Sequence, residues 1–206
     1  MQADKGIHIS GGKVTQWDDQ SGKGNNAVQA NASFQPTIIN NAVWNKPAIQ
    51  FDGIGQYMTL TSTLNLTDYS IFIVYQNKVT GSSSAVIADN GSADGCFMSF
   101  CSGNCYLIQV NGGSNYIEVT PPIVNNKYGL FEDVQNGNST YIWANATLLT
   151  ITNQAQPLTG ITLNSLAKNN YGYFDGDIVE IIIYNTRIIP TQRQSIENYV
   201  RTKYKI

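Results

Sequence analysis

Histidine is nearly absent from this sequence, and charge of either sign is scarce. His8 is the only histidine in 206 residues, so a Ser-His-Asp or Cys-His relay would depend on it alone. Zinc sites with two or three histidines are excluded, and we expect His8 to lie exposed in the first turn. Charged residues make up 13% of the chain and the formal net charge is −2. The sequence therefore lacks the basic face that nucleic-acid binding requires.

Long apolar runs are also missing. None approaches the roughly 18 residues of a membrane-spanning helix, and the first residues, MQADKGIHISGG, lack the apolar stretch of a signal peptide. Either secretion by that route is not used, or an upstream part is missing.

Cysteine is confined to Cys96, Cys101 and Cys105. This set allows one short-loop disulfide with a free thiol, or three free thiols. It is too small for a four-cysteine zinc site. Because no Lys or Arg lies within fifteen residues to lower a thiol pKa, a reactive role is not expected.

Turn formers, amides and aromatic residues are abundant, with 23 Asn, 18 Gly, 12 Tyr and 7 Phe. Short β-favouring runs separated by turn signals predict an all-β protein. Residues 48–52 place Ile49 and Phe51 on one face, and residues 57–60 do the same with Met58 and Leu60. Residues 69–76 are apolar on both faces, which is typical of a central, covered strand.

Three further elements are expected towards the C-terminus. Residues 177–185 form a strand with Val179, Ile181 and Ile183 on one face and Ile178, Glu180 and Ile182 on the other. Hairpins turn at Asn111-Gly112 and at Asn136-Gly137, with the positive φ values of type I′ turns.

Only the C-terminal end looks helical. A helix begins at Pro190 and packs on a sheet through a stripe of Ile196, Val200 and Tyr204, while Arg193, Glu197 and Arg201 lie elsewhere. No repeat or linker divides the chain, so we expect one domain.

Several strings resemble a known family. They are GGKVTQWDDQSGKGNNAVQ (residues 11–29), KPAIQFDG (46–53), YFDGDIVEIIIYN (173–185) and a terminal helix with IENYV (196–200). In this order they resemble the concanavalin A-like lectin/glucanase superfamily, in its laminin G type 3 branch of bacterial and phage proteins. The resemblance covers about residues 3–206, although residues 78–162 match only in pattern.

The resemblance implies a jelly-roll sandwich of two antiparallel sheets with a short C-terminal helix over residues 1–206. It also implies a binding or adhesive module of secreted, surface or particle-borne proteins, often with a calcium ion. Members of the branch begin with a longer first strand, of which Gln2-Ala3-Asp4 remains here. We therefore expect a domain from a longer chain, or simply a short first strand; a truncated edge would invite pairing with another chain.

Catalysis is not expected. Glycoside hydrolysis requires two carboxylates on one face. Asp177 and Glu180 are three residues apart and Glu132 and Asp133 are adjacent, so each pair should point to opposite faces. Asp175 and Asp177 are two residues apart, so a strand would place them on one face, but we expect them to be turn residues. Carboxylates on two neighbouring strands could still come together as a catalytic pair, and the sequence leaves this alternative open.

Calcium is the cofactor that the sequence favours. Loop oxygens of Asp19, Asn25, Asp52 and Asp175 could hold this cation. The alternative is that these side chains cap turns by accepting bonds from nearby backbone amides.

Carbohydrate recognition would use exposed rings and amides. The candidates are Asn169, Asn170, Tyr171 and Tyr173 in one loop, and Tyr141 with Trp143 on one strand. Trp143 could instead be a sandwich-face residue, and Tyr173 a core anchor. Trp17 and Trp44 are expected in the core or as loop anchors.

The sequence thus predicts a non-catalytic carbohydrate-binding or adhesion module of an extracellular, cell-surface or virion protein. Its partners would be a glycan or polysaccharide, and other protein subunits of a surface or particle assembly. One alternative is a structural decoration or fibre-head domain of a phage or virus that acts through protein contacts. A polysaccharide hydrolase is the other.

Overall fold

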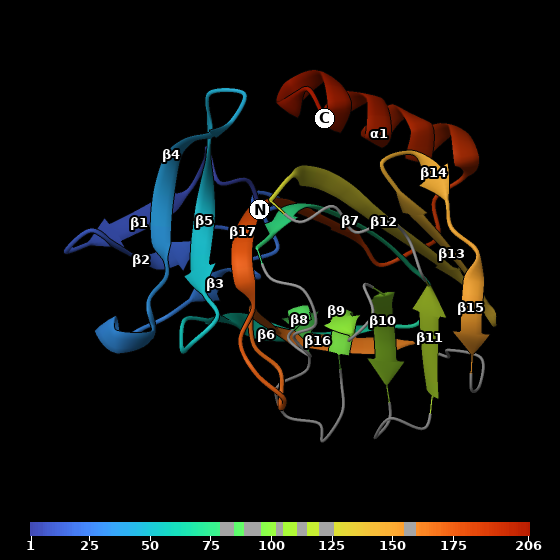
Figure 1. Ribbon diagram of the computed structural model, residues 1–206, viewed down its shortest axis with the longest axis horizontal. Helices are drawn as coiled ribbons and strands as arrows, with labels where there is room; N and C mark the ends of the chain where they lie inside the picture. Colours follow the sequence, from blue (N-terminus) through green and yellow to red (C-terminus); the bar gives the residue numbers. More distant parts are fainter. Residues whose placement is uncertain (79–84, 89–95, 102–104, 111–114, 120–125, 155–159) are drawn as a thin grey trace.

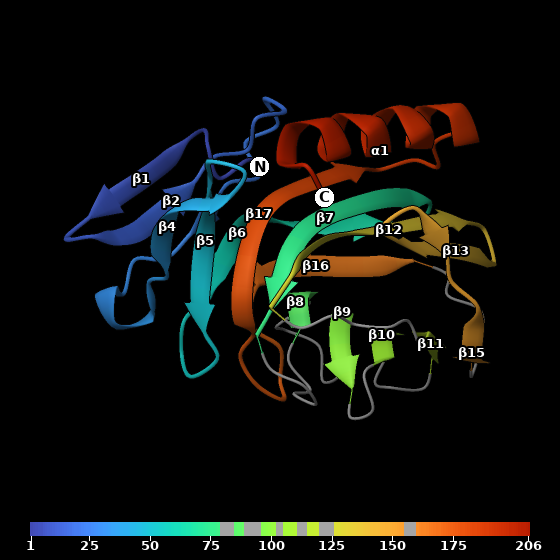
Figure 2. The same cartoon turned by 45° about the horizontal axis from the view of Figure 1, so that its top comes forward.

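A computed structural model describes residues 1–78, 85–88, 96–101, 105–110, 115–119, 126–154 and 160–206. The described strands all pair antiparallel and form one continuous sheet that curls over into two layers (Figure 1). A single α-helix, α1 (Pro190–Tyr204), lies on the outer side of one layer, as Figure 2 shows from a second direction. Among the described residues, no helix is long and apolar enough to cross a membrane.

The layer under α1 is built around a long central strand. Its strands are, in spatial order, β5 (Lys46–Asp52), β17 (Asp175–Tyr184), β7 (Tyr69–Asn77), β12 (Tyr128–Asn136), β13 (Ser139–Ala144) and β14 (Thr147–Leu148). As expected for its two apolar faces, β7 lies between β17 and β12, with Ile71 and Ile73 in one hydrophobic cluster and Phe72 and Val74 in another.

The second layer closes the other side of the sandwich. Its strands are β3 (Ala27–Val28), β6 (Met58–Leu66), β16 (Ile161–Leu166), β8 (Ala85–Ala88), β9 (Cys96–Cys101), β10 (Cys105–Val110), β11 (Asn115–Val119) and β15 (Ile151–Gln154). Three strands join the layers, β1 (Ile7–Ser10), β2 (Lys13–Trp17) and β4 (Thr37–Val43). A short 3₁₀ helix, η1 (Ala32–Phe34), precedes β4.

The main hydrophobic core fills the space between the layers. Ile49, Phe51, Met58 and Leu60 are buried in it on the faces that the sequence predicted. Trp17 is also fully buried, and its indole Nε1 donates to the Gln2 carbonyl at 2.9 Å. Burial of such apolar surface is the main stabilising term of a sandwich of this kind.

A β-bulge in β17 changes the predicted facing of that strand. The register slips between Ile178 and Glu180, so Ile178 packs into the inter-layer core and Val179 packs under α1. The prediction that Val179 shares a face with Ile181 and Ile183 was therefore wrong. Since the bulge adds one residue, Asp177 and Glu180 both point to the helix-covered side, and their predicted opposite facing was also wrong.

Both hairpins form, with one difference in turn geometry. β10 pairs with β11, although the Asn111-Gly112 turn lies outside the described residues. In the β12–β13 hairpin Asn136 pairs with Ser139, so Gly137 and Asn138 make the turn. Only Gly137 has a positive φ, 56°, which matches a type II′ turn and not the predicted type I′.

Trp44 and His8 also differ from what was expected. Trp44 lies at the tip of the β4–β5 hairpin and is 63% exposed, so it is not a core residue. His8 is exposed as predicted but lies in strand β1, where its Nε2 is 3.0 Å from an Asp18 oxygen. The side chains of Cys96, Cys101 and Cys105 lie outside the described part of the structure.

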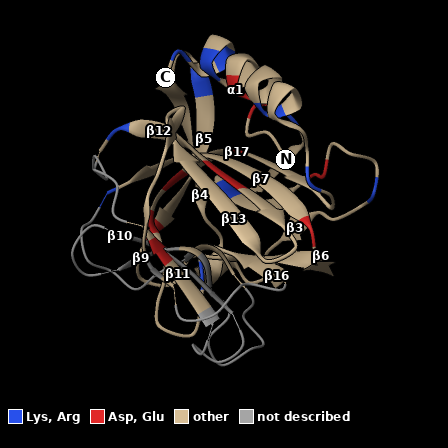
Figure 3. Cartoon of the chain, turned by 90° about the vertical axis from the view of Figure 1, so that its right-hand side faces the viewer, with Lys and Arg blue, Asp and Glu red and all other residues tan. Residues whose placement is uncertain are grey.

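Helix α1 begins at Pro190 and buries Val200 and Tyr204 as the sequence predicted. Glu197 is buried as well, and Arg193 reaches the sheet, where its Nη1 donates to Glu132 Oε2 at 2.7 Å. The expectation that these two residues lie away from the packed face was wrong. Figure 3 shows the Lys and Arg segments of α1 above acidic segments of the strands. Buried carboxylates of the sheet explain why the inner side of α1 carries basic residues.

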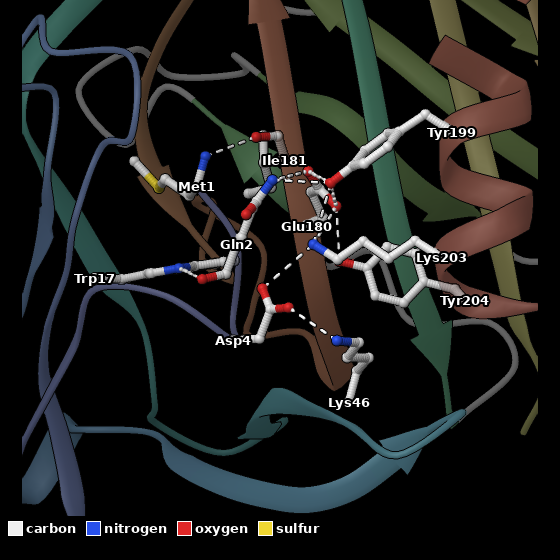
Figure 4. A network of polar contacts seen from close by, with 10 residues as sticks. All are labelled: Met1, Gln2, Asp4, Trp17, Lys46, Glu180, Ile181, Tyr199, Lys203 and Tyr204. Atoms are coloured by element: carbon white, nitrogen blue, oxygen red, sulfur yellow. Dashed lines mark hydrogen bonds and ion pairs between the residues drawn. The ribbon is translucent and has the colours of Figure 1, made fainter. Parts of the chain in front are cut away.

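The first three residues extend the helix-covered layer. Met1 and Ile181 exchange backbone hydrogen bonds, and the Ala3 amide donates to the Val179 carbonyl at 2.8 Å (Figure 4). This short segment therefore occupies the edge of β17 just beyond the end of β5.

Candidate functional site

Three aromatic rings from distant parts of the sequence meet at one end of the sandwich. The ring centroids of Phe34 and Tyr57 are 5.6 Å apart, and those of Tyr57 and Tyr173 are 6.3 Å apart. The Lys168 ammonium lies over this row, 4.5 Å from the Tyr57 ring and 5.8 Å from the Tyr173 ring. We call these four residues the loop-end cluster. Its row of rings, with a cation beside it, suits a ligand that has apolar faces and polar edges.

Local hydrogen bonds explain why the rings meet. The Tyr57 amide donates to the Phe34 carbonyl at 3.1 Å, and Gln29 Nε2 donates to the Tyr57 carbonyl at 3.1 Å. Asn31 caps η1 by accepting from the Ser33 amide, which fixes the position of Phe34.

The predicted Asn169–Tyr173 loop is a tight turn that carries part of the cluster. Asn169 is buried, and its Oδ1 accepts from the amides of Tyr171 and Gly172 at 3.0 and 2.9 Å. Asn169 thus shapes the loop, while Tyr171 is 55% exposed and Asn170 is exposed beside it. The structure brings Tyr173 into the loop-end cluster and leaves Tyr171 presented to solvent.

Gln56, the residue before Tyr57, is buried, and its Oε1 has no hydrogen-bond partner among the described residues. Because this oxygen is closed off from solvent, it does not form part of the exposed surface of the cluster.

Asp52 and Asp175 lie directly opposite each other where β5 meets β17. Asp52 Oδ1 accepts from the amides of Ile54, Gly55 and Gln56 at 2.9 to 3.1 Å. Burial alone would raise the pKa of Asp52, but these backbone bonds outweigh it and the pKa is lowered. Asp52 is the last residue of β5, and Asp175 and Asp177 both lie in β17. The expectation that Asp175 and Asp177 are turn residues was therefore wrong.

We expect opposite effects from removing these two carboxylates. Asp52→Ala should destabilise the fold by about 1–2 kcal/mol, because three amides of the 53–57 loop lose their acceptor. Asp175→Ala should be neutral or slightly stabilising, because it removes a like charge that faces Asp52 across the strands. Urea unfolding of both variants checks this, and equal losses would contradict it.

Tyr141 and Trp143 form a second aromatic surface at the outer edge of β13. Their rings are stacked with centroids 6.2 Å apart, and Tyr141 is 43% exposed. The Arg193 guanidinium covers the Trp143 ring at 4.4 Å. Since Arg193 already occupies one face of Trp143, Tyr141 is the more accessible ring of the pair.

Asp19 and Asn25 lie in a separate loop before β3. Asp19 accepts from the Ser21 amide and hydroxyl, both at 2.8 Å, and from the Asn25 amide at 3.1 Å. Burial would raise the pKa of Asp19, but these hydrogen bonds lower it. Both oxygens of Asp19 are thus used in organising the loop.

The predicted calcium ligands fit a resident ion poorly. Among the described residues no group of three or more His, Cys, Asp or Glu side chains comes together. The four candidates fall into two places, and the carboxylates of Asp19 and Asp52 already accept backbone bonds. Calcium needs six to eight oxygens, so only the Asp52–Asp175 pair offers the beginning of such a site, and calcium stays a prediction.

Three buried carboxylates on the face of this layer that α1 covers each have a positively charged partner. Asp177 accepts from Lys78 Nζ at 2.7 Å and from the Tyr128 hydroxyl at 2.8 Å, Glu180 lies 3.3 Å from Lys203 Nζ, and Glu132 binds Arg193. Burial raises the pKa of Glu132 to about 7, against the opposing effect of Arg193. Glu132 and Glu180 connect strands to α1, and Asp177 connects β17 to Lys78 and to Tyr128 of β12.

Sequence reasoning missed Phe34, Tyr57 and Lys168. Their positions in three segments far apart in the chain give no local pattern. Only the aromatic side chains within otherwise polar turns could have drawn attention to the first two.

No family model matches the sequence, and no curated protein does. Many solved structures are similar in fold, among them the three that follow. The binding domain of Paraclostridial Mosquitocidal Protein 1 has 11% identity and a TM-score of 0.61, over 94% of this chain and 51% of that one. An arabinofuranosidase complexed with arabinofuranosyl-α-1,2-xylobiose has 11% identity and a TM-score of 0.59, over 93% and 51%. A heptameric SAP-like pentraxin from Limulus polyphemus has 11% identity and a TM-score of 0.55, over 73% and 81%.

The chain spans about half the length of the first two of these structures. At such identities the likeness concerns the fold alone. The predicted fold class is confirmed: this chain is an all-β, antiparallel jelly-roll sandwich with a C-terminal helix.

Proposed function

We propose that this chain is a non-catalytic carbohydrate-binding module, of the laminin G-like type, within an extracellular, cell-surface or particle-borne protein. The loop-end cluster is the binding surface in this proposal. The observation that carries it is the row of Phe34, Tyr57 and Tyr173 rings, with the Lys168 ammonium over the rings of Tyr57 and Tyr173. Aromatic rings stack on the C–H faces of sugars, while amides and ammonium groups bond their hydroxyls.

Two features of the surroundings support this surface. Tyr171 and Asn170 stand exposed in the same loop as Tyr173, and Phe34 at the other end of the row is 36% exposed. The arabinofuranosidase that was solved with arabinofuranosyl-α-1,2-xylobiose shares the fold, which supports a sugar ligand by analogy only.

The absence of catalysis is part of the proposal. A glycoside hydrolase needs one carboxylic acid that stays protonated near neutral pH. Asp52, which faces Asp175 near the cluster, has a lowered pKa and stays ionised. Glu132, whose pKa is raised, lies under α1 and is bonded to Arg193.

A glycan and polysaccharide screen with three variants tests the site. Tyr57→Ala and Tyr171→Ala should each weaken binding up to about tenfold, since one stacked ring contributes roughly 0.5–1.5 kcal/mol. Tyr141→Ala is the matched control, because it removes a 43% exposed ring from the other aromatic surface. A loss on Tyr141→Ala alone would move the site to β13.

The same screen separates the remaining alternatives. Running it with calcium and with chelator, and repeating it with Asp175→Asn, tests whether the Asp52–Asp175 pair holds an ion. Release of reducing sugar from any bound polysaccharide would overturn the non-catalytic proposal. A folded sample that binds no glycan would favour a structural role on a phage or virus particle.

A further inference from the structure

Lys168 is the charged member of the loop-end cluster, and local bonds hold the turn that carries it. Ala167 has a positive φ of 64°, and Lys168 pairs with Tyr173 across the turn. The Ser165 hydroxyl donates to the Lys168 carbonyl at 2.8 Å. Figures 1 and 2 show the β16–β17 loop at the same end of the sandwich as the β5–β6 loop, which contains Tyr57. The backbone therefore fixes the root of the Lys168 side chain beside the rings.

Lys168 differs from the other half-buried lysines of this chain. Lys46, Lys78 and Lys203 each have Nζ within 3.5 Å of a carboxylate oxygen. Lys168 and Lys13 are half-buried too, but no carboxylate of the described residues lies within ion-pair distance of either. Of these two, only Lys168 has its ammonium over described aromatic rings.

The rings attract this ammonium without neutralising it. Its Nζ lies 4.5 Å from the Tyr57 ring centroid and 5.8 Å from that of Tyr173. Such contacts use the negative face of a ring that carries no net charge, so a full positive charge remains on Lys168. An ammonium also has three hydrogen-bond donors. A carboxylate or sulfate group of a bound sugar would supply both the opposite charge and strong acceptors.

The acidic residues around the cluster do not take this role. Asp52 is the acidic residue nearest in the sequence to Tyr57, and Asp175 is the nearest to Tyr173. Neither carboxylate lies within ion-pair distance of Lys168, and Asp52 Oδ1 already accepts from three backbone amides. Since the chain has a net charge of −2, no basic face attracts an acidic polymer from a distance. Selectivity for an anion must therefore come from contact with Lys168 itself.

We propose that the loop-end cluster binds glycans that carry a negatively charged group, and that Lys168 contacts this group while the rings hold the sugar. The inference rests on the proposed function and adds the class of ligand to it. An ammonium is a compact point charge, so it accepts a carboxylate or a sulfate alike. The anion alone is not sufficient, because a single ion pair near the surface contributes little.

Two matched pairs of polysaccharides test the proposal on the whole chain. They are polygalacturonate with its methyl ester, and dextran sulfate with dextran. Excess chelator is present throughout, so that calcium cannot bridge the protein and the polymer. The acidic member of at least one pair should bind about tenfold or more tightly than its neutral partner, because hydrogen bonds to charged groups are the stronger ones. The pair that responds identifies the anion as carboxylate or sulfate.

Variants of Lys168 show whether this residue causes the preference. Lys168→Met keeps the stem against the rings and removes the charge, so the acidic and neutral members should then bind equally. Lys168→Arg keeps the charge and should keep the preference. Lys23→Met is the matched control, because it removes a positive charge from an exposed position in the loop before β3. It should leave the affinities for both members unchanged.

Salt provides a second readout that a purely structural role of Lys168 would not give. Raising the ionic strength from about 0.05 M to about 0.5 M shortens the screening length severalfold. The affinity of the wild-type chain for the acidic member should fall severalfold over this range. Its affinity for the neutral member, and both affinities of Lys168→Met, should change little.

Three results would overturn the inference. They are equal binding of acidic and neutral members by the wild-type chain, a preference that Lys168→Met retains, and an equal loss of preference in Lys23→Met. Binding of neutral members that Tyr57→Ala weakens would then leave the proposed function standing without this ligand class. If a folded sample binds no glycan at all, acidic or neutral, the proposed function itself fails and the inference fails with it.

Discussion

Replacing Asp133 with asparagine should remove the larger part of the pH dependence of unfolding between about pH 4 and pH 8. Asp133 is fully buried between the layers, where the Tyr69 hydroxyl donates to its Oδ2 at 3.1 Å. Its Oδ1 has no partner, and no cation among the described residues contacts it. Burial therefore raises the pKa of Asp133 to about 8, against the smaller lowering effect of Tyr69.

The sign follows from the direction of this shift. Because the folded state holds the proton more tightly than the unfolded state, stability is greatest below the unfolded pKa near 4. It falls by about 1.4 kcal/mol for each pH unit until the folded pKa is reached. Asparagine is neutral throughout, so Asp133→Asn should lose this slope. Glu132, whose pKa burial raises to about 7, contributes to the slope that remains.

Urea unfolding at a series of pH values measures the effect. Tyr69→Phe is the matched control, because it keeps the carboxyl group and removes its hydrogen-bond donor. In that variant the pKa of Asp133 should rise further and the loss of stability should extend to higher pH. Parallel pH profiles for the wild-type chain and Asp133→Asn would show that this group does not titrate with folding.

The architecture was largely predictable because the strands follow the alternation of apolar residues. The two-sided apolar run around Ile71 and Phe72 identified the central strand, and Pro190 located the start of α1. In both cases a local pattern determines which side is buried. The β17 bulge breaks that rule, since an extra residue in the ladder leaves no mark in the alternation itself.

The candidate site was predictable only in part, for a related reason. Tyr171 and Tyr173 lie in a loop whose composition marks it as exposed, whereas Phe34 and Tyr57 reach the same place through other loops. Arg193 and Glu197 were assigned to the solvent side of α1 because they are charged. Their burial depends on Glu132 of the sheet, a partner that no spacing within the helix reveals.

Glu180→Ala should be among the most destabilising single substitutions in this chain, at about 3–5 kcal/mol. Glu180 is 2% exposed and accepts from Gln2 Nε2 at 2.8 Å and from the Tyr204 hydroxyl at 2.6 Å. The Tyr199 hydroxyl lies 3.1 Å from its Oε1, and Lys203 Nζ lies 3.3 Å from its Oε2 (Figure 4). One carboxylate thus joins the N-terminal segment, β17 and the last turns of α1.

The large cost comes from the partners that are left behind. Without Glu180, the buried Tyr204 hydroxyl loses its acceptor and Lys203 keeps only Asp4, at 3.3 Å, as an anionic partner. Burial alone would lower the pKa of Lys203, but Tyr199, Glu180 and Asp4 together raise it, so the ammonium stays charged. Removing the carboxylate therefore leaves an undercompensated cation near the sheet.

Chemical denaturation of a small set of variants distinguishes this cause from a loss of packing. Glu180→Gln keeps the acceptor for Tyr204 and should cost less than Glu180→Ala, and Tyr204→Phe should cost about 1–3 kcal/mol. In the double variant Glu180→Ala/Lys203→Met the stranded cation is gone, so part of the stability should return. A double variant less stable than Glu180→Ala would show that Lys203 stabilises the fold mainly through Asp4, Tyr199 and Tyr204. The negative charge of Glu180 would then not be the reason for the loss of stability in Glu180→Ala.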